Sequence, residues 1–144
     1  MSVFTTARTL VWAIAASVLS ACTPLELVGS HWALQAMDGQ PPIPHAVPTL
    51  SFLPDGRLAG MASCNRYFGQ FTHQSEQLSV TLGGSTKMWC EGSGGDVMAQ
   101  ESRFMELLAQ AHRVSTPDGQ LWIHTPEAQA SLRFVALKPS PEPR

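Results

Sequence analysis

Cysteine thiols are the side chains of this sequence whose positions most directly suggest chemistry. The 144-residue chain contains three of them, Cys22, Cys64 and Cys90. Cys22 follows an N-terminal apolar run and a short stretch of small residues, which together are typical of a targeting segment. Cys64 and Cys90 remain as a pair, and two thiols in an exported domain imply one disulfide bridge. For a loop of this length the chain-entropy treatment gives a stabilisation of roughly 3 to 4 kcal/mol.

The N-terminus predicts a targeting segment. Residues 1–21 carry one side-chain charge, on Arg8, then an apolar run over 9–18 that is too short to span a bilayer, and then small residues. A motif follows, Leu19-Ser20-Ala21-Cys22, which resembles the lipobox at which bacterial lipoproteins are cleaved before a lipidated cysteine. The alternatives are a core cysteine behind a core helix and an ordinary signal with a chance cysteine. Because residue 23 is Thr and not Asp, analogy with lipoprotein sorting in Gram-negative bacteria indicates the outer membrane, with the domain facing the periplasm.

The length of the chain leaves room for one compact domain. We expect a lipoprotein signal peptide over 1–21, a lipidated cysteine and tether over 22–29, a domain over 30–137 and a Pro-rich tail over 138–144. The sequence has 9 basic and 11 acidic side chains and a net charge of −2. Phosphate binding needs a cationic surface, so nucleic acid is not an expected partner. The expected membrane contact is the lipid anchor, since several acyl chains on one cysteine hold a protein essentially permanently.

No catalytic or metal-binding template fits the sequence. Zinc sites need about four closely spaced ligands, whereas the histidines are scattered: His31, His45, His73, His112 and His124. The glycine loop 91–95 lacks the first Gly of a Gly-x-Ser-x-Gly elbow, and Ser-Thr-Lys at 85–87 lacks the Ser-x-x-Lys spacing. We therefore expect no enzymatic activity, no cofactor and no metal. An enzyme would need a cleft that joins a histidine, for instance His31 or His73, to a carboxylate.

Periodicity predicts a mainly β domain with one helix. Alternating apolar residues or extended segments between turns indicate strands around 32–35 and over 49–53, 57–63, 67–73, 78–82, 85–89, 112–116, 120–125 and 131–137. The turn Pro54-Asp55-Gly56 predicts a hairpin. A helical period covers 97–111, with Asp96 as the expected N-cap. The fold class is α+β: a small antiparallel sheet or partly closed barrel packed with a single α-helix.

Aromatic residues on these strands are expected to face inward. Trp32, Trp89 and Trp122 all lie on expected strands. Large aromatic side chains dominate cores, so we expect these three to be core or barrel lining.

A longer pattern resembles the META domain family, whose best-known members are HslJ-type heat-inducible proteins. The resemblance runs over about 27–137, and its centre is the stretch 60–71 (Gly-Met-Ala-Ser-Cys-Asn-Arg-Tyr-Phe-Gly-Gln-Phe), followed by Thr-Lys-Met-Trp-Cys at 86–90. Further matches are Trp-Ala-Leu at 32–34, Glu101, Phe104 and Leu108. Ser63 departs from the family, which usually has Gly there. The resemblance implies a compact, mainly β domain, often on lipoproteins, linked to stress tolerance and antibiotic resistance without an established chemistry.

Four motif residues are candidates for a structural or a binding role. Asn65 tolerates a left-handed backbone and its amide bonds nearby backbone, so we expect it to shape a turn. The guanidinium of Arg66 could clamp a ligand carboxylate or pair with Glu91 or Asp96. Gly60 and Gly69 are expected to permit a bulge or a close backbone approach.

These observations favour a non-enzymatic, membrane-anchored periplasmic lipoprotein that supports envelope stress tolerance or antibiotic resistance. Its partner would be an unknown envelope protein. The alternatives are a lipocalin-like module with a small apolar ligand in a cavity lined by Trp and Phe, and an inhibitor of an envelope enzyme.

Overall fold

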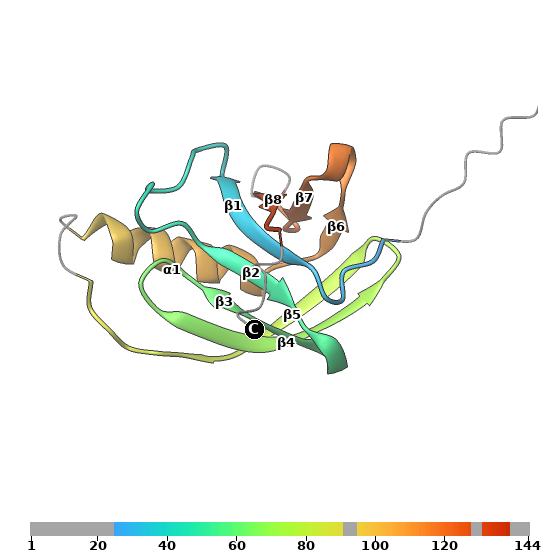
Figure 1. Cartoon of the computed structure of the whole chain (residues 1–144), viewed down its shortest axis with the longest axis horizontal. Coiled ribbons are helices and arrows are strands. Elements are labelled where there is room, and N and C mark those ends of the chain that lie inside the picture. Colours follow the sequence, from blue (N-terminus) through green and yellow to red (C-terminus); the bar gives the residue numbers. More distant parts are fainter. Residues whose placement is uncertain (1–24, 91–94, 128–130, 139–144) are drawn as a thin grey trace, which may run out of the picture.

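The computed structural model of the chain describes residues 25–90, 95–127 and 131–138, and shows a closed antiparallel barrel of eight strands with one α-helix (Figure 1). The strands are β1 (His31–Met37), β2 (Thr49–Phe52), β3 (Arg57–Met61), β4 (Arg66–Gln74), β5 (Gln77–Ser85), β6 (Arg113–Ser115), β7 (Leu121–His124) and β8 (Ser131–Ala136). The helix α1 (Asp96–Ala109) lies between β5 and β6 in the chain. The expected fold class is confirmed.

Each strand pairs with its neighbour in sequence, and β8 closes the barrel on β1. Both Pro-Asp-Gly turns form short 3-10 segments, Pro54–Gly56 before β3 and Pro117–Gly119 before β7. Asp55 and Asp118 have positive φ angles of 63° and 54°, which Asp tolerates better than most residues. The expected hairpin between β2 and β3 therefore forms, and a similar turn leads from β6 to β7.

Helix α1 begins at Asp96, the residue that was expected to cap it. Gly95 occupies the N-cap position with a φ of 88° and no side-chain cap bond, and Asp96 is the first helical residue. The expectation that Asp96 caps the helix was wrong, because a glycine just before it takes the left-handed conformation that turns the chain into the helix. Asp96 still favours the helix, since an acidic side chain in the first turn interacts well with the helix dipole.

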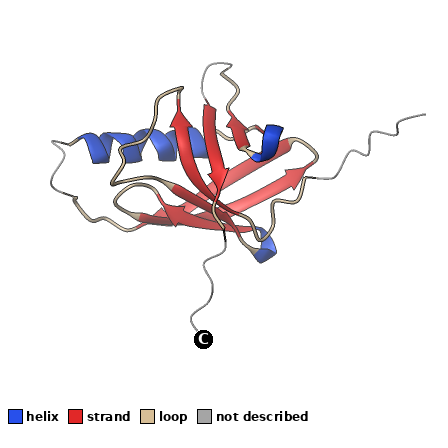
Figure 2. Cartoon of the chain, turned by 45° about the horizontal axis from the view of Figure 1, so that its top comes forward, coloured by secondary structure: helices blue, strands red, loops and turns tan. Residues whose placement is uncertain are grey.

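The helix buries one face against the barrel and contacts β5 and β8 (Figure 2). Phe104 is fully buried between two aromatic rings, with centroid distances of 5.7 Å to Tyr67 and 6.4 Å to Phe134. Deeper in the barrel the rings of Phe52 and Phe71 meet edge to face at 4.9 Å. These rings and the buried aliphatic side chains occupy the described interior of the barrel.

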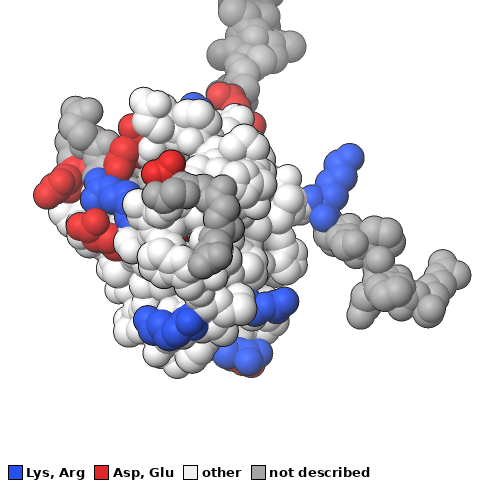
Figure 3. All heavy atoms as spheres, turned by 90° about the vertical axis from the view of Figure 1, so that its left-hand side faces the viewer, with Lys and Arg blue, Asp and Glu red and all other residues white. Residues whose placement is uncertain are grey.

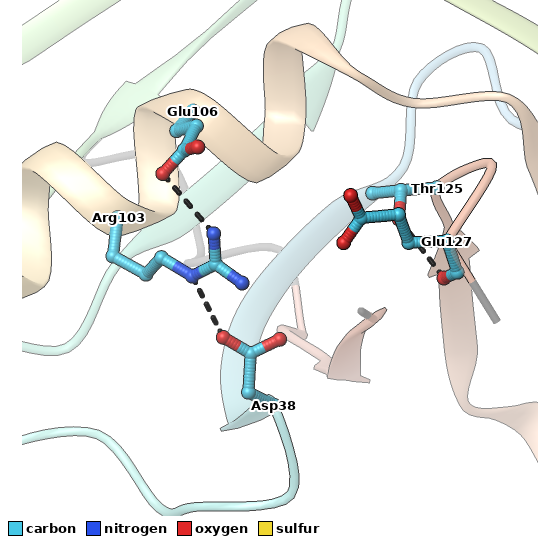
Figure 4. A network of polar contacts seen from close by, with 5 residues as sticks. All are labelled: Asp38, Arg103, Glu106, Thr125 and Glu127. Carbon is cyan, nitrogen blue, oxygen red and sulfur yellow. Dashed lines mark hydrogen bonds and ion pairs between the residues drawn. The ribbon is translucent and has the colours of Figure 1, made fainter. Parts of the chain in front are cut away.

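An exposed ion pair also links the helix to the turn after β1 (Figure 4). Arg103 Nε lies 2.8 Å from Asp38 Oδ2, and Arg103 Nη1 lies 3.1 Å from Glu106 Oε2 on the same helix. Thr125 is bonded to the backbone of Glu127 in the same view. Because the Arg103 pairs are solvent-exposed, they contribute little, about 0 to 1 kcal/mol each. The buried face is what holds α1 in place.

The packed domain begins before the expected boundary at residue 30. Leu27 is buried in the core, and the Gly29 N–H donates to Phe52 O at 2.7 Å. The expected tether over 22–29 thus contributes its second half to the fold. The expected signal peptide, 1–21, Cys22 itself and most of the expected tail, 139–144, lie outside the described residues. Within the described ranges, no helix has the length and apolar character to cross a membrane.

Tyr67 gives the core a test by titration. It is the single tyrosine of the chain, its hydroxyl donates to Thr49 O at 2.7 Å, and burial raises its pKa well above the ordinary value. The folded state therefore keeps the neutral phenol, whereas the unfolded chain loses that proton above about pH 10, so stability falls as pH rises beyond that value. Ultraviolet absorbance should show phenolate only as circular dichroism shows unfolding. Phenolate formation near pH 10 in the folded protein would contradict this burial.

Candidate functional site

The central motif lies where the connection from β3 to β4 meets helix α1. Glu101 belongs to the buried face of the helix, and the residue is 8% exposed. Its Oε2 accepts the backbone N–H groups of Cys64 at 3.0 Å and Asn65 at 2.8 Å. Its Oε1 accepts the side-chain amide of Asn65 at 2.7 Å. One buried carboxylate is thus held by three N–H donors, which compensates its removal from water.

The Asn65 side chain joins this carboxylate to the segment that follows β5. Its Oδ1 accepts the Thr86 hydroxyl at 2.8 Å and the Met88 N–H at 2.7 Å. Its Nδ2 donates to Met88 O at 3.0 Å as well as to Glu101. With two bonds accepted and two donated, the amide has used its full capacity. Asn65 therefore connects three parts of the chain and has no free atom with which to bind a ligand.

The disulfide fastens the same segment a second time. Cys64 and Cys90 are bridged, with their Cα atoms 5.9 Å apart, within the range that a disulfide spans. The expected pairing of these two cysteines is confirmed. Residues 86–90 are consequently held at Met88 by Asn65 and at Cys90 by the bridge.

Gln100 extends the polar cluster on the helix. Its Oε1 accepts the Ile43 N–H at 2.7 Å, and its Nε2 donates to Ala46 O at 2.7 Å and to Ser63 Oγ at 2.8 Å. Ser63, which stands where the family usually has Gly, has a φ of 154°. This positive angle favours glycine, and the bond from Gln100 offsets part of its cost. Sequence reasoning missed Gln100, although a polar residue one position before Glu101 on an otherwise apolar helix face is a visible signal.

Arg66 does not join this cluster. Its side chain is exposed and makes no ion pair with any residue of the described ranges, Asp96 included. Glu91, the other expected partner, lies outside those ranges. The backbone of Arg66 does pair with Thr86, accepting its N–H at 3.0 Å and donating to its Oγ1 at 3.1 Å. The side chain of Arg66 is therefore exposed, and its backbone holds the start of the segment 86–90.

The motif glycines lie where strands approach closely. A Cβ on Gly60 would stand 2.1 Å from Thr49 O and 2.9 Å from the Tyr67 hydroxyl. A Cβ on Gly69 would stand 2.4 Å from Thr81 O, next to the register shift between Phe68 and Gly69. Neither backbone position has room for a side chain without displacing a neighbouring strand.

The three tryptophans that were expected to face inward have different environments. Trp32 is 7% exposed and belongs to the core. Trp122 faces outward from β7, stacked on His124 and with the Arg133 guanidinium 5.4 Å from its ring centroid, so the expectation that it lines the core or the barrel was wrong. Trp89 is 70% exposed, so the expectation that it lines the core or the barrel was wrong. The barrel strand ends at Ser85, and beyond it the alternation of side chains no longer turns one face inward.

The histidines form no catalytic arrangement within the described residues. His31 Nδ1 lies 2.7 Å from Ser51 Oγ, and His73 Nε2 lies 2.6 Å from Ser75 O. In the parts of the chain that the structure covers, no three His, Cys, Asp or Glu side chains gather as a metal site would require. Burial, aided by the charge of Arg113, lowers the pKa of His124, which favours its neutral form.

Two hollows of the described surface are candidate binding cavities. One of about 540 Å³ lies at the β4–β5 hairpin, and its lining includes His73, Gln77 and His112. Another of about 350 Å³ lies against β2 to β4, and its lining includes Thr49, Met61 and Arg66. Neither lies in the barrel interior, which the core side chains fill. A lipocalin-like carrier needs an interior cavity, so the described barrel gives that alternative no support.

Comparison with known proteins agrees with this architecture. The model of the META domain family matches residues 25–139. A structure determined by NMR of a protein from Burkholderia xenovorans is similar at 22% identity, with a TM-score of 0.62, over 93% of this chain and 99% of that one. A crystal structure of a DUF4847 family protein from Bacteroides vulgatus is similar at 13% identity, with a TM-score of 0.58, over 79% of this chain and 96% of that one. At these identities the structures show the shared fold alone. No curated protein matches the sequence. The family match covers most of the chain and includes the whole barrel, and the chain therefore belongs to the META domain family.

Proposed function

We propose that this META domain is a non-enzymatic lipoprotein of the bacterial envelope, anchored through Cys22. The observation that carries the proposal is the lipobox-like motif directly before a well-packed domain. Leu27, five positions after Cys22, is already buried in the core. An extended chain of five residues spans at most about 17 Å. A lipid on Cys22 would therefore hold the barrel close to the membrane surface.

The bonding of the motif supports a non-enzymatic role. The polar atoms of Asn65 and Glu101 are engaged with one another and with the backbone, and the two cysteines of the domain are bridged. General acid or base catalysis needs a titratable group within reach of a substrate. In this motif the groups of that kind instead fix the connection from β3 to β4 against the helix.

The proposal also specifies where the protein is located and which biological role it has. Thr23 after the lipidated cysteine supports sorting to the outer membrane, with the barrel in the periplasm. Membership of the META family supports a role of HslJ type in stress tolerance or antibiotic resistance. A disulfide in the domain fits an oxidising compartment such as the periplasm.

Metabolic labelling with a clickable palmitate tests the anchor. We expect label on the wild-type protein, which should fractionate with membranes, and none on Cys22→Ala, which should lose that association. Thr23→Asp is the matched control, because it should keep the label and change only the membrane to which the protein sorts. An unlabelled wild type that fractionates identically to Cys22→Ala would refute the proposal.

A further inference from the structure

We propose that an exposed surface formed by Phe68, Met88 and Trp89 docks onto an anionic phospholipid membrane. We call it the aromatic surface. The exposed fractions of these side chains are 59%, 55% and 70%. Large apolar side chains that are more than half exposed and grouped together mark interaction sites. Among the described residues only two other large hydrophobic side chains are exposed, Val28 and Leu137, and they lie in other parts of the chain.

The grouping follows from backbone pairing between the start of β4 and the segment after β5. Phe68 pairs with Gly84, and the next outward position of β4, Arg66, pairs with Thr86. Met88 is hydrogen-bonded to Asn65, the residue directly before Arg66. Side chains two apart on a strand project from the same face. Phe68 and Arg66 therefore project from one face of β4, and the exposed residues 86–89 belong to the segment that runs alongside the start of that strand.

Phe68 lies over a platform that has no side chains of its own. Its ring covers Gly83 and Gly84, so close that a Cβ on either glycine would stand 2.9 or 3.1 Å from a ring carbon. The register shift in the β4–β5 pair occurs at this place. Because the two glycines have no side chains, the ring can lie close to the backbone there, so the fold itself positions this side chain.

The segment that carries Trp89 is equally well fixed. On one side of it, Met88 is bound through both backbone polar groups to Asn65. On the other, Cys90 is bridged to Cys64. The backbone is thus held on one side of the exposed Trp89 by two hydrogen bonds and on the other by a disulfide. A rigid surface loses little conformational entropy when it binds.

The basic residues near the aromatic surface indicate an anionic binding partner. Arg66 and Lys87 are exposed on this surface, and neither makes an ion pair within the described ranges. Viewed from the end that faces left in Figure 1, the lower half of the molecule carries Lys and Arg with almost no Asp or Glu, and the acidic side chains lie mainly in the upper half (Figure 3). Trp at the membrane interface together with basic side chains suits an anionic bilayer, and each basic residue near such a surface contributes about 1 kcal/mol.

The position of the aromatic surface complements the proposed anchor without depending on it. Both ribbon views place the segment 86–90 toward one end of the long axis and the first described residues toward the other (Figures 1 and 2). With Cys22 anchored near the second end, contact through the aromatic surface would lay the barrel along the bilayer. Linking two weak contacts in this way raises the overall affinity through effective concentration. The aromatic surface belongs to the folded domain, so it can be tested without lipid.

The test uses the unlipidated chain from residue 22, which includes every described strand and the helix. It is mixed with vesicles of equal parts phosphatidylglycerol and phosphatidylcholine, or of phosphatidylcholine alone, and sedimented. We expect roughly tenfold or stronger preference for the anionic vesicles, reduced by high salt. Trp89→Ser should weaken binding by about tenfold, and Lys87→Gln by about fivefold. Val28→Ser and Lys138→Gln are the matched controls and should bind like the wild type.

Thermal unfolding of each variant shows whether it folds. Three outcomes of the sedimentation experiment would overturn the docking proposal. Absence of binding to anionic vesicles would do so. If folded Trp89→Ser bound the anionic vesicles as well as the wild type does, the membrane contact would belong to another part of the molecule. Self-association that Trp89→Ser abolishes, without vesicle binding, would assign the aromatic surface to a second copy of the chain. Failure of palmitate labelling at Cys22 would leave these results unchanged, so this inference and the proposed function fail separately.

Discussion

Replacing Glu101 with alanine is expected to lower the free energy of unfolding by about 3 to 5 kcal/mol. The substitution removes the acceptor for three N–H groups, two from the backbone of Cys64 and Asn65 and one from the Asn65 side chain. Each buried donor left without a partner costs about 1 to 3 kcal/mol, and partial rearrangement lowers the sum. Chemical denaturation followed by circular dichroism measures the loss.

Glu101→Gln separates the carboxylate from the size of the side chain. A glutamine amide has one acceptor oxygen, so its NH₂ must face either the two backbone N–H groups or the Asn65 amide. Asn65 cannot reverse to accept it, because its Oδ1 already accepts from Thr86 and Met88. We therefore expect a loss of about 2 kcal/mol from Gln as well.

The control for both variants is Glu106→Gln on the exposed face of the same helix. Glu106 pairs with Arg103 in solvent, and an exposed pair of this kind contributes about 0 to 1 kcal/mol. If Glu101→Ala proved as mild as Glu106→Gln, the buried network would not be the element that holds the helix to the barrel.

Replacing Cys64 and Cys90 together with serine is expected to lower the free energy of unfolding by about 3.5 kcal/mol. The bridge closes a loop whose ends are 26 positions apart, and the chain-entropy treatment assigns about this stabilisation to such a loop. The double variant avoids a lone reactive thiol. Denaturation of the wild type with and without reductant should give the same difference.

The loss of the bridge should also weaken the docking of residues 86–90. Asn65 still holds Met88 in the double variant, so we expect the segment to remain in place at its start and to loosen at Trp89. The Trp89 side chain takes part in neither the hydrogen bond nor the disulfide. We therefore expect Trp89→Ser to leave the free energy of unfolding within about 0.5 kcal/mol of the wild type. Unfolding that is unaffected by reductant would mean that the bridge adds nothing to the native state.

Much of the barrel is predictable from the sequence because its period is simple. Tyr67, Gly69 and Phe71 occupy alternate positions of β4, and they do face inward, whereas Phe68 between them faces outward. Pro54-Asp55-Gly56 marks its turn by residue type alone, since Asp and Gly tolerate the backbone angles that it requires. The apolar stripe of Phe104 and Leu108 likewise identifies the buried face of the helix.

What the sequence left open depends on contacts between distant segments. The expectation for Trp89 was wrong because apolar content was taken for burial, whereas the disulfide and Asn65 hold this part of the chain outside the barrel. The role of Glu101 was visible only as part of a family pattern. A carboxylate on an apolar helix face signals a buried partner, but the distance in sequence between Glu101 and Asn65 hides which one. For Arg66 the sequence suggested an acidic partner nearby in the chain, but the side chain is exposed and forms no ion pair with a described residue.

The intact mass of the protein extracted from the membrane fraction, taken without reduction, reports the anchor and the disulfide in a single experiment. We expect a chain that begins at Cys22, carries acyl chains on that residue, and is two hydrogens lighter than the reduced form because Cys64 and Cys90 are bridged. A soluble product with the mass of the full 144-residue chain, about 15.6 kDa, and with all three thiols reduced would contradict this expectation.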